Sequence, residues 1–381
     1  MLVQHKITSD GTVIGPRPGI EEKLGDFRSR FDCHLFNLYP ARDRKATWSI
    51  NPFPHRIAAK INLLDPDIVH LHWIGSGFVP VSEIRKIKKP IIWTLHDMWA
   101  FTGGCHYSGD CTRFREQCGR CPQLGSRHYD LSSCIWKRKA ALYQNKDPVI
   151  VCPSKWLAGC AKKSTLLKNA RIEVIPNGID TGIFRPIEKS AARRSLGLPP
   201  DKKLILFGAI NSAGDTRKGF SHLVLALNHL LATDPSMKPE CMIFSSRDRS
   251  RVEIAGYHLH NLGNVPGEDR LAHVYSAADV FVAPSVQENL ANTVMESLAC
   301  GTPVVAFTIG GMPDMIDHER NGYLATPYSP ASMAEGIGWI LHHPAPGTLS
   351  LHARQKVMEN FESETVARHY EDLYTAVQGT G

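Results

Sequence analysis

Short apolar runs alternate with amphipathic stretches along most of the chain, and this alternation predicts a parallel α/β protein. The runs are rich in Val, Ile and Leu, and most end in polar residues, proline or glycine. Continuous apolar runs of about 4–8 residues are typical of strands buried on both faces of a sheet. The predicted strands span residues 67–72, 90–95, 148–152, 172–180, 203–207, 241–244, 260–266, 279–284 and 304–307, and a last strand follows a turn at 321–324.

Stretches with helical periodicity separate these strands. The predicted helices span residues 52–64, 81–88, 131–145, 157–167, 270–277, 291–299, 315–318, 332–341 and 361–377. A linker with a first capping helix is expected over 184–200, and a further helix follows Lys218-Gly219. A chain of 381 residues is long for one hydrophobic core and suits two domains. We therefore predict an N-terminal α/β domain over 1–180, a C-terminal α/β domain over 181–355, and a terminal helical segment over 356–381.

The most informative stretch is 279–311, which is predicted to form a strand, a polar loop, a helix and a second strand. Such a crossover gathers polar residues at the carboxyl ends of the strands, where parallel sheets bind ligands. Glu288 precedes the predicted helix and Glu296 lies within it. The two carboxylates can hold two ends of an elongated ligand, while the free N–H groups at the helix start favour an anion such as a diphosphate. Each glutamate taken alone is more simply explained as a surface residue.

The same stretch resembles the nucleotide-sugar site of family 4 retaining glycosyltransferases. The residues that match the family pattern are Ser285, Glu288, Glu296, Ala299, Gly301, Pro303, Val304, Val305, Ala306, Gly310 and Gly311. The positions that depart from it are Leu290, Ala291, Ser297 and Asp314. The resemblance implies a GT-B fold, in which two Rossmann-like doubly wound domains face each other across a cleft. It also implies that the C-terminal helix crosses back to the first domain.

By this resemblance, the protein transfers a sugar from a UDP-, GDP- or ADP-sugar to a hydroxyl of a glycan or lipid-linked acceptor. The family retains the anomeric configuration and requires no cofactor or catalytic metal ion. The donor-binding residues that the resemblance implies in this stretch and before it are Val265, Glu288, Asn289, Leu290, Asn292, Thr293 and Glu296. Within this set, Glu296 is expected to bind the ribose and Glu288 the donor sugar.

A second loop follows the predicted strand at 203–207 and contains Lys218-Gly219. A glycine-containing loop with a lysine just before a helix is a candidate phosphate site, because backbone N–H groups and a cation converge there. In the family, an arginine soon after the strand and a lysine before glycine hold the donor diphosphate. Lys218 matches, but Ala209 follows Gly208 where the arginine is expected. The arginine of this diphosphate-binding pair is therefore absent unless Arg217 takes its place. An Arg-Lys pair alone is more often a surface feature.

Two histidines follow successive predicted strands in the N-terminal half. His72-Trp73 comes after the strand at 67–72, and His96 comes after the strand at 90–95. Because neighbouring parallel strands end at the same sheet edge, we expect these side chains to lie together in a binding crevice. A single histidine is usually structural, but two at adjacent strand ends favour a site. The Thr-Leu-His-Asp string also resembles the family's N-domain motif, which assigns His96 to the reacting sugar; His72 and Trp73 are expected on the acceptor side.

Four cysteines lie in the stretch that follows His96: Cys105, Cys111, Cys118 and Cys121. The last two are separated by two residues, which is a spacing typical of metal knuckles. Four thiolates could hold a structural zinc ion, with an iron–sulfur cluster as the weaker alternative and four free thiols as the other. The sequence leaves these possibilities open, and a catalytic metal is not implied.

Composition narrows the class of protein further. Hydrophobic residues make up 43% and charged residues 21% of the chain, as in ordinary globular proteins. The formal net charge of +7 permits attraction to anionic substrates or lipid headgroups but does not indicate nucleic acid. A basic helix over 131–145 could meet such an anionic acceptor, although a solvated face is the more common explanation. We expect a cytoplasmic protein, either free or bound peripherally to the inner face of a membrane.

Other functions share parts of this pattern. A GT-B epimerase or a phosphorylase would use the same donor-binding residues, and an inactive homologue would bind nucleotide sugar without turning it over. The inactive alternative arises from Ala209 and from the start of the chain, where residues 1–5 are expected to be the end of a strand. The strand, Gly-rich loop and helix that open many family members are not found before that segment. We therefore expect a natural protein that starts further upstream.

Overall fold

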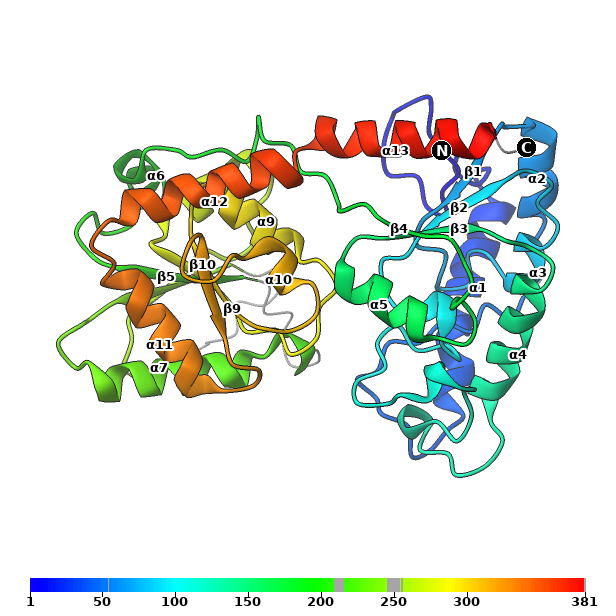
Figure 1. Cartoon of the computed structure of the whole chain (residues 1–381), viewed down its shortest axis with the longest axis horizontal. Coiled ribbons are helices and arrows are strands. Elements are labelled where there is room, and N and C mark those ends of the chain that lie inside the picture. The colour runs from blue at the N-terminus through cyan, green and yellow to red at the C-terminus, as the bar shows by residue number, and fades with distance from the viewer. Residues whose placement is uncertain (54, 209–215, 245–253, 255, 380–381) are drawn as a thin grey trace. The chain divides into compact units, whose positions relative to one another are not determined.

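The computed structural model describes residues 1–53, 55–208, 216–244, 254 and 256–379. The chain forms two compact units (Figure 1). Unit 1 consists of Met1–Pro153, Leu157–Val174 and Leu373–Gly381, and unit 2 consists of Ser154–Trp156 and Ile175–Asp372. In the part of the chain that the structure describes, no helix has both the length and the apolar character needed to cross a membrane.

Unit 1 contains a parallel sheet with its strands in chain order: β1 (Val69–Leu71), β2 (Ile91–Thr94), β3 (Val149–Cys152) and β4 (Ile172–Val174). The inner strands are buried on both faces, which explains their continuous apolar sequence. The helices of this unit are α1 (Ile20–Asn37), α2 (Ile57–Leu64), α3 (Val81–Ile84), α4 (Leu131–Tyr143) and α5 (Lys155–Lys163), whose first two residues are counted in unit 2. Short 3₁₀ turns follow β2 at Trp99–Phe101, Arg113–Arg115 and Pro122–Leu124.

Unit 2 contains a wider parallel sheet in the order β10-β9-β8-β5-β6-β7. Its strands are β5 (Leu204–Gly208), β6 (Glu240–Phe244), β7 (Leu259–Asn261), β8 (Val280–Ala283), β9 (Val304–Phe307) and β10 (Gly322–Ala325). The strand order reverses after β5, because β6 and β7 lie on one side of it and β8 to β10 on the other. This reversal is the switch point of a doubly wound sheet, where ligands bind at the carboxyl ends of the strands.

Helices cover both faces of the unit 2 sheet and form two hydrophobic cores. On one face lie α7 (Phe220–Thr233) and α11 (Pro330–Leu341), with buried side chains such as Leu227 and Ile337. On the other face lie α6 (Lys189–Leu196), α8 (Glu268–Ala277), α9 (Asn292–Ala299) and α12 (Pro346–Asn360). Figure 1 shows α7 and α11 together on one side and α6, α9 and α12 on the other. The short α10 (Met312–Met315) and the terminal α13 (Ser363–Gln378) complete the unit, and the last residues of α13 belong to unit 1.

Several predicted boundaries are wrong. Residues 321–324 were expected to form a turn, but Gly322–Ala325 pair with β9 as β10. The helix expected over 315–318 lies one turn earlier, as α10, because Met315 and Ile316 are buried in the core and residue 318 already bridges to Gly322. Two helices, α1 and α12, were not predicted. The apolar residues of α1 recur with helical spacing at 20, 24, 27, 31 and 35, a signal that was overlooked, whereas α12 begins with Pro346-Gly347, which was interpreted as a break in the chain.

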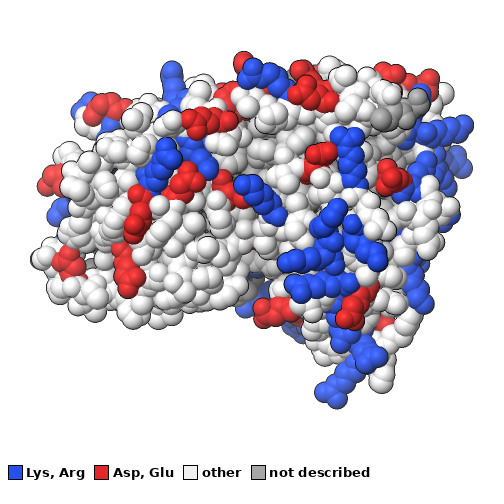
Figure 2. All heavy atoms as spheres, viewed as in Figure 1, with Lys and Arg blue, Asp and Glu red and all other residues white. Residues whose placement is uncertain are grey.

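The basic face expected on the helix over 131–145 is present at Lys137 and Arg138, which are exposed, but Lys139 requires correction. Lys139 of α4 is buried, with 1% of its surface exposed, and its ammonium donates hydrogen bonds to the carbonyl oxygens of Trp99 and Thr102. The ammonium also lies 3.7 Å from the centre of the Trp99 ring. In Figure 2, Lys and Arg side chains gather on the part of unit 1 where Figure 1 draws α5, whose last turn carries Lys162 and Lys163.

Candidate functional site

The loop between β8 and α9 in unit 2 is flanked by two glycines that let other loops approach it. Gly219 has φ +69, and a Cβ atom built on it would lie 1.8 Å from the carbonyl oxygen of Pro284. Gly310 has φ +53, and a Cβ atom on it would lie 1.8 Å from the carbonyl oxygen of Glu288. No side chain fits at such distances, so glycine is required at both positions. The two glycines that adjoin the predicted site therefore fix the shape of this loop.

Lys218 and Glu288, which are 70 residues apart in the chain, meet at this loop. The Lys218 ammonium donates a hydrogen bond of 2.7 Å to a carboxylate oxygen of Glu288. The Glu288 side chain is 12% exposed and that of Lys218 is 37% exposed, so the pair opens to solvent on the lysine side. The backbone N–H of Val286 also donates to the Arg217 carbonyl oxygen at 2.7 Å. The structure thus places the predicted cation beside the predicted donor-sugar carboxylate.

The start of the same loop system is more crowded. Gly208 ends β5, and a Cβ atom there would lie 2.4 Å from the Phe244 ring. Arg217 lies in the 3₁₀ turn Thr216–Lys218. Ala209, where the family pattern has arginine, lies outside the described residues. The described geometry therefore places Lys218 only. The arginine expected in the diphosphate site stays a prediction.

Glu296 lies on α9 and contacts α8. One of its carboxylate oxygens accepts a hydrogen bond of 2.7 Å from the hydroxyl of Tyr275, a buried core residue. Burial raises the pKa of Glu296, and the nearby Glu268 carboxylate raises it further, while the Tyr275 hydroxyl opposes this change. Tyr275 thus orients the carboxylate without neutralising it. A carboxylate held in this way can accept hydrogen bonds from the hydroxyls of a ribose.

The amino end of α9 provides backbone donors. The helix begins at Asn292, and the preceding residue, Ala291, has a methyl side chain that cannot cap the first turn. The first N–H groups of a helix have no partner within the helix, so those of Asn292 and Thr293 can bind an anion. The Asn292 side chain accepts a hydrogen bond of 3.3 Å from the Asn177 amide. This end of α9 therefore suits the phosphate role predicted for it.

The remaining predicted donor residues are buried or partly buried in unit 2. Asn289 is buried and accepts a hydrogen bond of 2.6 Å from the Ser154 hydroxyl. Leu290 is 6% exposed and belongs to the hydrophobic core, so it could act on a ligand only through its backbone. Val265 follows β7 and packs partly against the same core. Sequence reasoning did not identify Ser154 or Tyr275, whose contacts depend on the tertiary fold.

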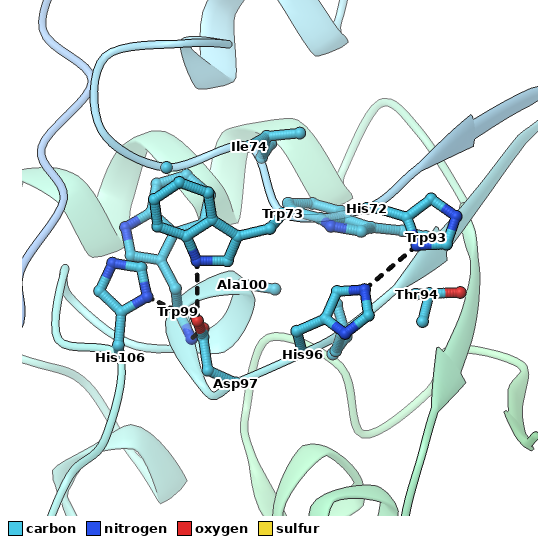
Figure 3. A pocket seen from close by; sticks show the side chains of 12 residues that line it. His72, Trp73, Ile74, Trp93, Thr94, His96, Asp97, Trp99, Ala100 and His106 are labelled. Atoms are coloured by element: carbon cyan, nitrogen blue, oxygen red, sulfur yellow. Dashed lines mark hydrogen bonds and ion pairs between the residues drawn. The ribbon is translucent and has the colours of Figure 1, made fainter. Parts of the chain in front are cut away.

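A second candidate site lies in unit 1, at the carboxyl ends of β1 and β2 (Figure 3). The rings of His72 and His96 are stacked and joined by a hydrogen bond of 3.1 Å. The indole N–H of Trp73 donates to the Asp97 carboxylate at 3.1 Å, and the Trp73 side chain is 46% exposed. The structure thus brings together the residues predicted at these two strand ends. Burial lowers the pKa of both His72 and His96, which favours neutral imidazoles.

Sequence reasoning missed His106, which lines this pocket, and Ser49, which contacts His106. His106 donates a hydrogen bond of 2.6 Å from Nδ1 to the Asp97 carboxylate, and its Nε2 lies 2.9 Å from the Ser49 hydroxyl. Asp97 therefore joins Trp73 and His106, as Figure 3 shows. The signal that could have revealed His106 is its place within the cysteine-rich stretch directly after the strand-end histidine. No local signal marks Ser49, because the contact joins segments 57 residues apart.

The four cysteines lie in the same unit and are free. Cys105, Cys118 and Cys121 are close enough to influence one another, and burial raises the pKa of the Cys118 thiol to about 12 and that of Cys121 to about 11. Cys105 and Cys121 also pack in a small core with Trp48. Within the described residues, no three of these sulfur atoms lie within 4.8 Å of one another. A structural zinc ion at this cluster stays a prediction.

Two family models match the chain, and each falls on one half of it. The model of Glycosyltransferase Family 4 matches residues 12–182. The model of Glycosyl transferases group 1 matches residues 201–343, a range that includes Lys218, Glu288 and Glu296. The match to both models agrees with the resemblance found in the sequence.

Curated relatives give the same result. The chain is 33% identical over 298 residues to D-inositol 3-phosphate glycosyltransferase 2 of Catenulispora acidiphila, and 34% identical over 292 residues to D-inositol 3-phosphate glycosyltransferase of Acidothermus cellulolyticus. These alignments cover 73% and 72% of this chain but 63% and 59% of the relatives. The chain therefore spans about three fifths of the length of these relatives.

Two solved structures share this fold over most of the chain. Sucrose-phosphate synthase from Thermosynechococcus elongatus aligns with a TM-score of 0.66 and 21% identity over 97% of this chain and 84% of that one. HepE from Anabaena, solved with UDP, aligns with a TM-score of 0.61 and 16% identity over 84% of this chain and 82% of its own. These alignments confirm the predicted GT-B fold. The two family models and the curated relatives show that the chain belongs to the family 4, or group 1, glycosyltransferases.

Proposed function

We propose that the protein transfers a sugar from a nucleotide diphosphate sugar to a hydroxyl acceptor, with retention of the anomeric configuration. The observation that carries this proposal is the contact between Lys218 and Glu288 at the switch point of a doubly wound sheet. A cation, a carboxylate and the free amides of a helix start lie on adjoining loops of one unit, and Glu296 follows on the same helix. Family membership supports the same chemistry.

The demanding step is departure of the nucleotide diphosphate as the bond from the anomeric carbon to the phosphate oxygen breaks. Negative charge grows on that oxygen, and Lys218 with the amides of Asn292 and Thr293 would stabilise it. The bond from the acceptor oxygen to the anomeric carbon forms on the same face, and the acceptor proton passes to the leaving phosphate. Since these groups supply the positive charge, the proposed reaction requires no metal ion in the donor site.

Glu288 and Glu296 would orient the donor. Glu288 already positions Lys218, and on binding it would exchange part of this contact for the sugar hydroxyls. Glu296, held by Tyr275, would accept hydrogen bonds from the ribose. Solved structures of the same fold include one of HepE with UDP-glucose, which makes UDP-sugars the first donors to test.

The unit 1 pocket would bind sugar hydroxyls. We assign His96 to the sugar being transferred, and His72 and Trp73 to the acceptor. Neutral imidazoles can both donate and accept hydrogen bonds, and an exposed indole can stack on the apolar face of a sugar ring. A glycan or lipid-linked acceptor fits this assignment.

The test begins with binding of UDP-, GDP- and ADP-sugars, followed by turnover with product analysis. We expect Lys218→Ala to lower turnover by about 100-fold or more while changing donor affinity less, because its charge acts mainly on the departing phosphate. Glu296→Ala should weaken donor binding. Lys238→Ala, an exposed lysine in the same unit, is the matched control.

The products distinguish the alternatives. Formation of sugar phosphate would indicate a phosphorylase, and conversion of the nucleotide sugar without an acceptor would indicate an epimerase. Donor binding without turnover would indicate an inactive homologue. Kinetics and binding that are unchanged in both the Lys218 and Glu296 variants would refute the assignment of the donor site.

A further inference from the structure

A histidine pair and a glutamate lie together at the edge of the unit 2 sheet, and none of the three is among the residues assigned to the donor. His258 lies directly before β7, and His260 lies within it. Because the two residues are two positions apart, their side chains point to the same face of the strand. Cys241 pairs with Leu259 in the parallel register, which sets Glu240 beside His258 on the neighbouring strand. Three groups from two adjacent strands are thus brought to one side of the sheet.

The three side chains converge closely. The Nε2 atom of His260 lies 2.6 Å from a carboxylate oxygen of Glu240, and the ring centres of His258 and His260 are 4.6 Å apart. One ligand atom from each of the three residues lies within 4.8 Å of the other two. His260 and Glu240 are 18% and 17% exposed, whereas His258 lies at the surface. An ion can therefore enter from the His258 side and reach two ligands that are already held in place.

We propose that Glu240, His258 and His260 bind a divalent transition metal ion of the zinc class. Two imidazoles and one carboxylate form a ligand set that suits Zn²⁺, Co²⁺ or Ni²⁺ and leaves room for a water molecule. A simple ion pair between His260 and Glu240 would explain one of the contacts. That ion pair does not involve His258, which also brings a ligand atom within 4.8 Å of the ligand atoms of both other residues.

The ion would stabilise the edge of the sheet by linking β6 to β7. Among the strands that the structure describes, β7 is the last of the order β10-β9-β8-β5-β6-β7, so its hydrogen bonds to a neighbouring strand lie on one side. Ligands on both β6 and β7 would tie these strands together through side chains as well as backbone. The segment after β7 carries Val265 and leads into α8, which contributes Tyr275 to the core. The role we infer is structural, and it is independent of the donor chemistry proposed above.

The test uses the full-length protein, stripped with a chelator and titrated with Co²⁺ as the probe. Absorption by bound Co²⁺ distinguishes this site from the cysteine cluster, because thiolate ligands produce intense charge-transfer bands and histidine and carboxylate ligands do not. We expect one equivalent without thiolate bands, and a higher melting temperature when the ion is bound. His258→Ala should weaken this binding by about 100-fold. Because His258 lies at the surface, the variant should fold normally.

A second variant and a control complete the experiment. His260→Gln should also abolish the signal, and His229→Ala, which changes an exposed histidine of α7, should leave it unchanged. If the wild-type protein bound no Co²⁺, or bound it only with thiolate bands, the proposal would be overturned. Equal binding by the wild type and His258→Ala would overturn it as well. Neither outcome would affect the donor assignment, which is measured by nucleotide-sugar binding.

Discussion

At the scale of single residues, Glu296 combines a cost in stability with a proposed role in binding. Burial raises the pKa of its carboxyl group, which means that the folded protein holds the proton more strongly than the unfolded chain does. Ionisation near neutral pH therefore opposes folding, and this contribution disappears as the pH falls below the usual pKa of a glutamate. A residue that is ionised at the expense of stability is typical of functional sites.

This leads to a prediction for Glu296→Gln. The amide oxygen can still accept the Tyr275 hydrogen bond, but the buried charge is removed, so the melting temperature should stay the same or rise. Donor binding should weaken by about tenfold, because a neutral amide accepts hydrogen bonds from hydroxyls less strongly than a carboxylate does. Calorimetric titration and thermal unfolding measure the two effects separately. Loss of both stability and binding would indicate that Glu296 is only structural, and Glu335→Gln, at an exposed position, is the control.

The residues that sequence reasoning placed in the site differ from those it missed in one physical respect. Glu288, Lys218 and His96 each follow a strand, so the strand-loop-helix pattern alone brings them to a sheet edge. Ser49 and Tyr275 take part through contacts across the fold, and nothing near them in the chain records their partners. Local pattern predicts where a loop emerges, whereas the tertiary structure decides which side chains support it.

At the scale of elements, the loop before α9 depends on the close approach of Gly310. We predict that Gly310→Ala displaces this loop, because the new Cβ atom would lie 1.8 Å from the Glu288 carbonyl oxygen and the residue has φ +53. The free energy of unfolding should fall by about 2 kcal/mol or more, and donor binding should fall with it. Chemical denaturation and calorimetric titration provide the two measurements.

Gly197 offers a control for that prediction. Its φ is +68, similar to that of Gly310, but no atom lies within 4 Å of a Cβ atom built there. Gly197→Ala therefore carries the backbone strain without the collision, and it should cost about 1 kcal/mol and leave donor binding unchanged. If the two variants behaved alike, the close approach at Gly310 would not be what shapes the loop.

The elements that could be predicted are those with long apolar runs. β8 and β9 were predicted within two residues because they are buried on both faces and are bounded by Pro284 and Gly301. β10 was mistaken for a turn, since Asn321-Gly322 is a strong turn signal in isolation. In the fold, Asn321 instead caps the segment before β10, because its side chain bonds to the backbone of Met315 and Asp317.

At the scale of the whole molecule, the two α/β halves could be predicted from alternating pattern and length. The exact composition of the units could not. Residues 154–156 belong to unit 2 although they follow β3, and the end of α13 belongs to unit 1 although it closes the chain. Both arrangements depend on contacts between segments far apart in the sequence, which leave no periodic signal.

The end of α13 is held in unit 1 by His70, and this contact predicts acid sensitivity. The two ring nitrogens of His70 lie 2.7 Å from the hydroxyls of Tyr374 and Thr94, and Tyr374 is 304 residues away in the chain. Burial, with the neighbouring His72 and His96, lowers the pKa of His70 to about 3. The unfolded chain takes up a proton at His70 near pH 6.5, whereas the folded protein does not until about pH 3, so acidification between these values favours unfolding.

We expect His70 to account for about 1–2 kcal/mol of the stability lost between about pH 7.5 and about pH 5. His70→Gln should lower the stability at neutral pH, because the bonds to Tyr374 and Thr94 are weakened, but it should also flatten the dependence on pH. Denaturation at each pH measures the slope, and His34→Gln, at an exposed site on α1, should keep the slope of the wild type. If the substitution only weakened the contacts of His70, the free energy of unfolding would fall equally at every pH, and its slope against pH would not change. That result would mean that the proton on His70 does not govern how the end of the chain is held.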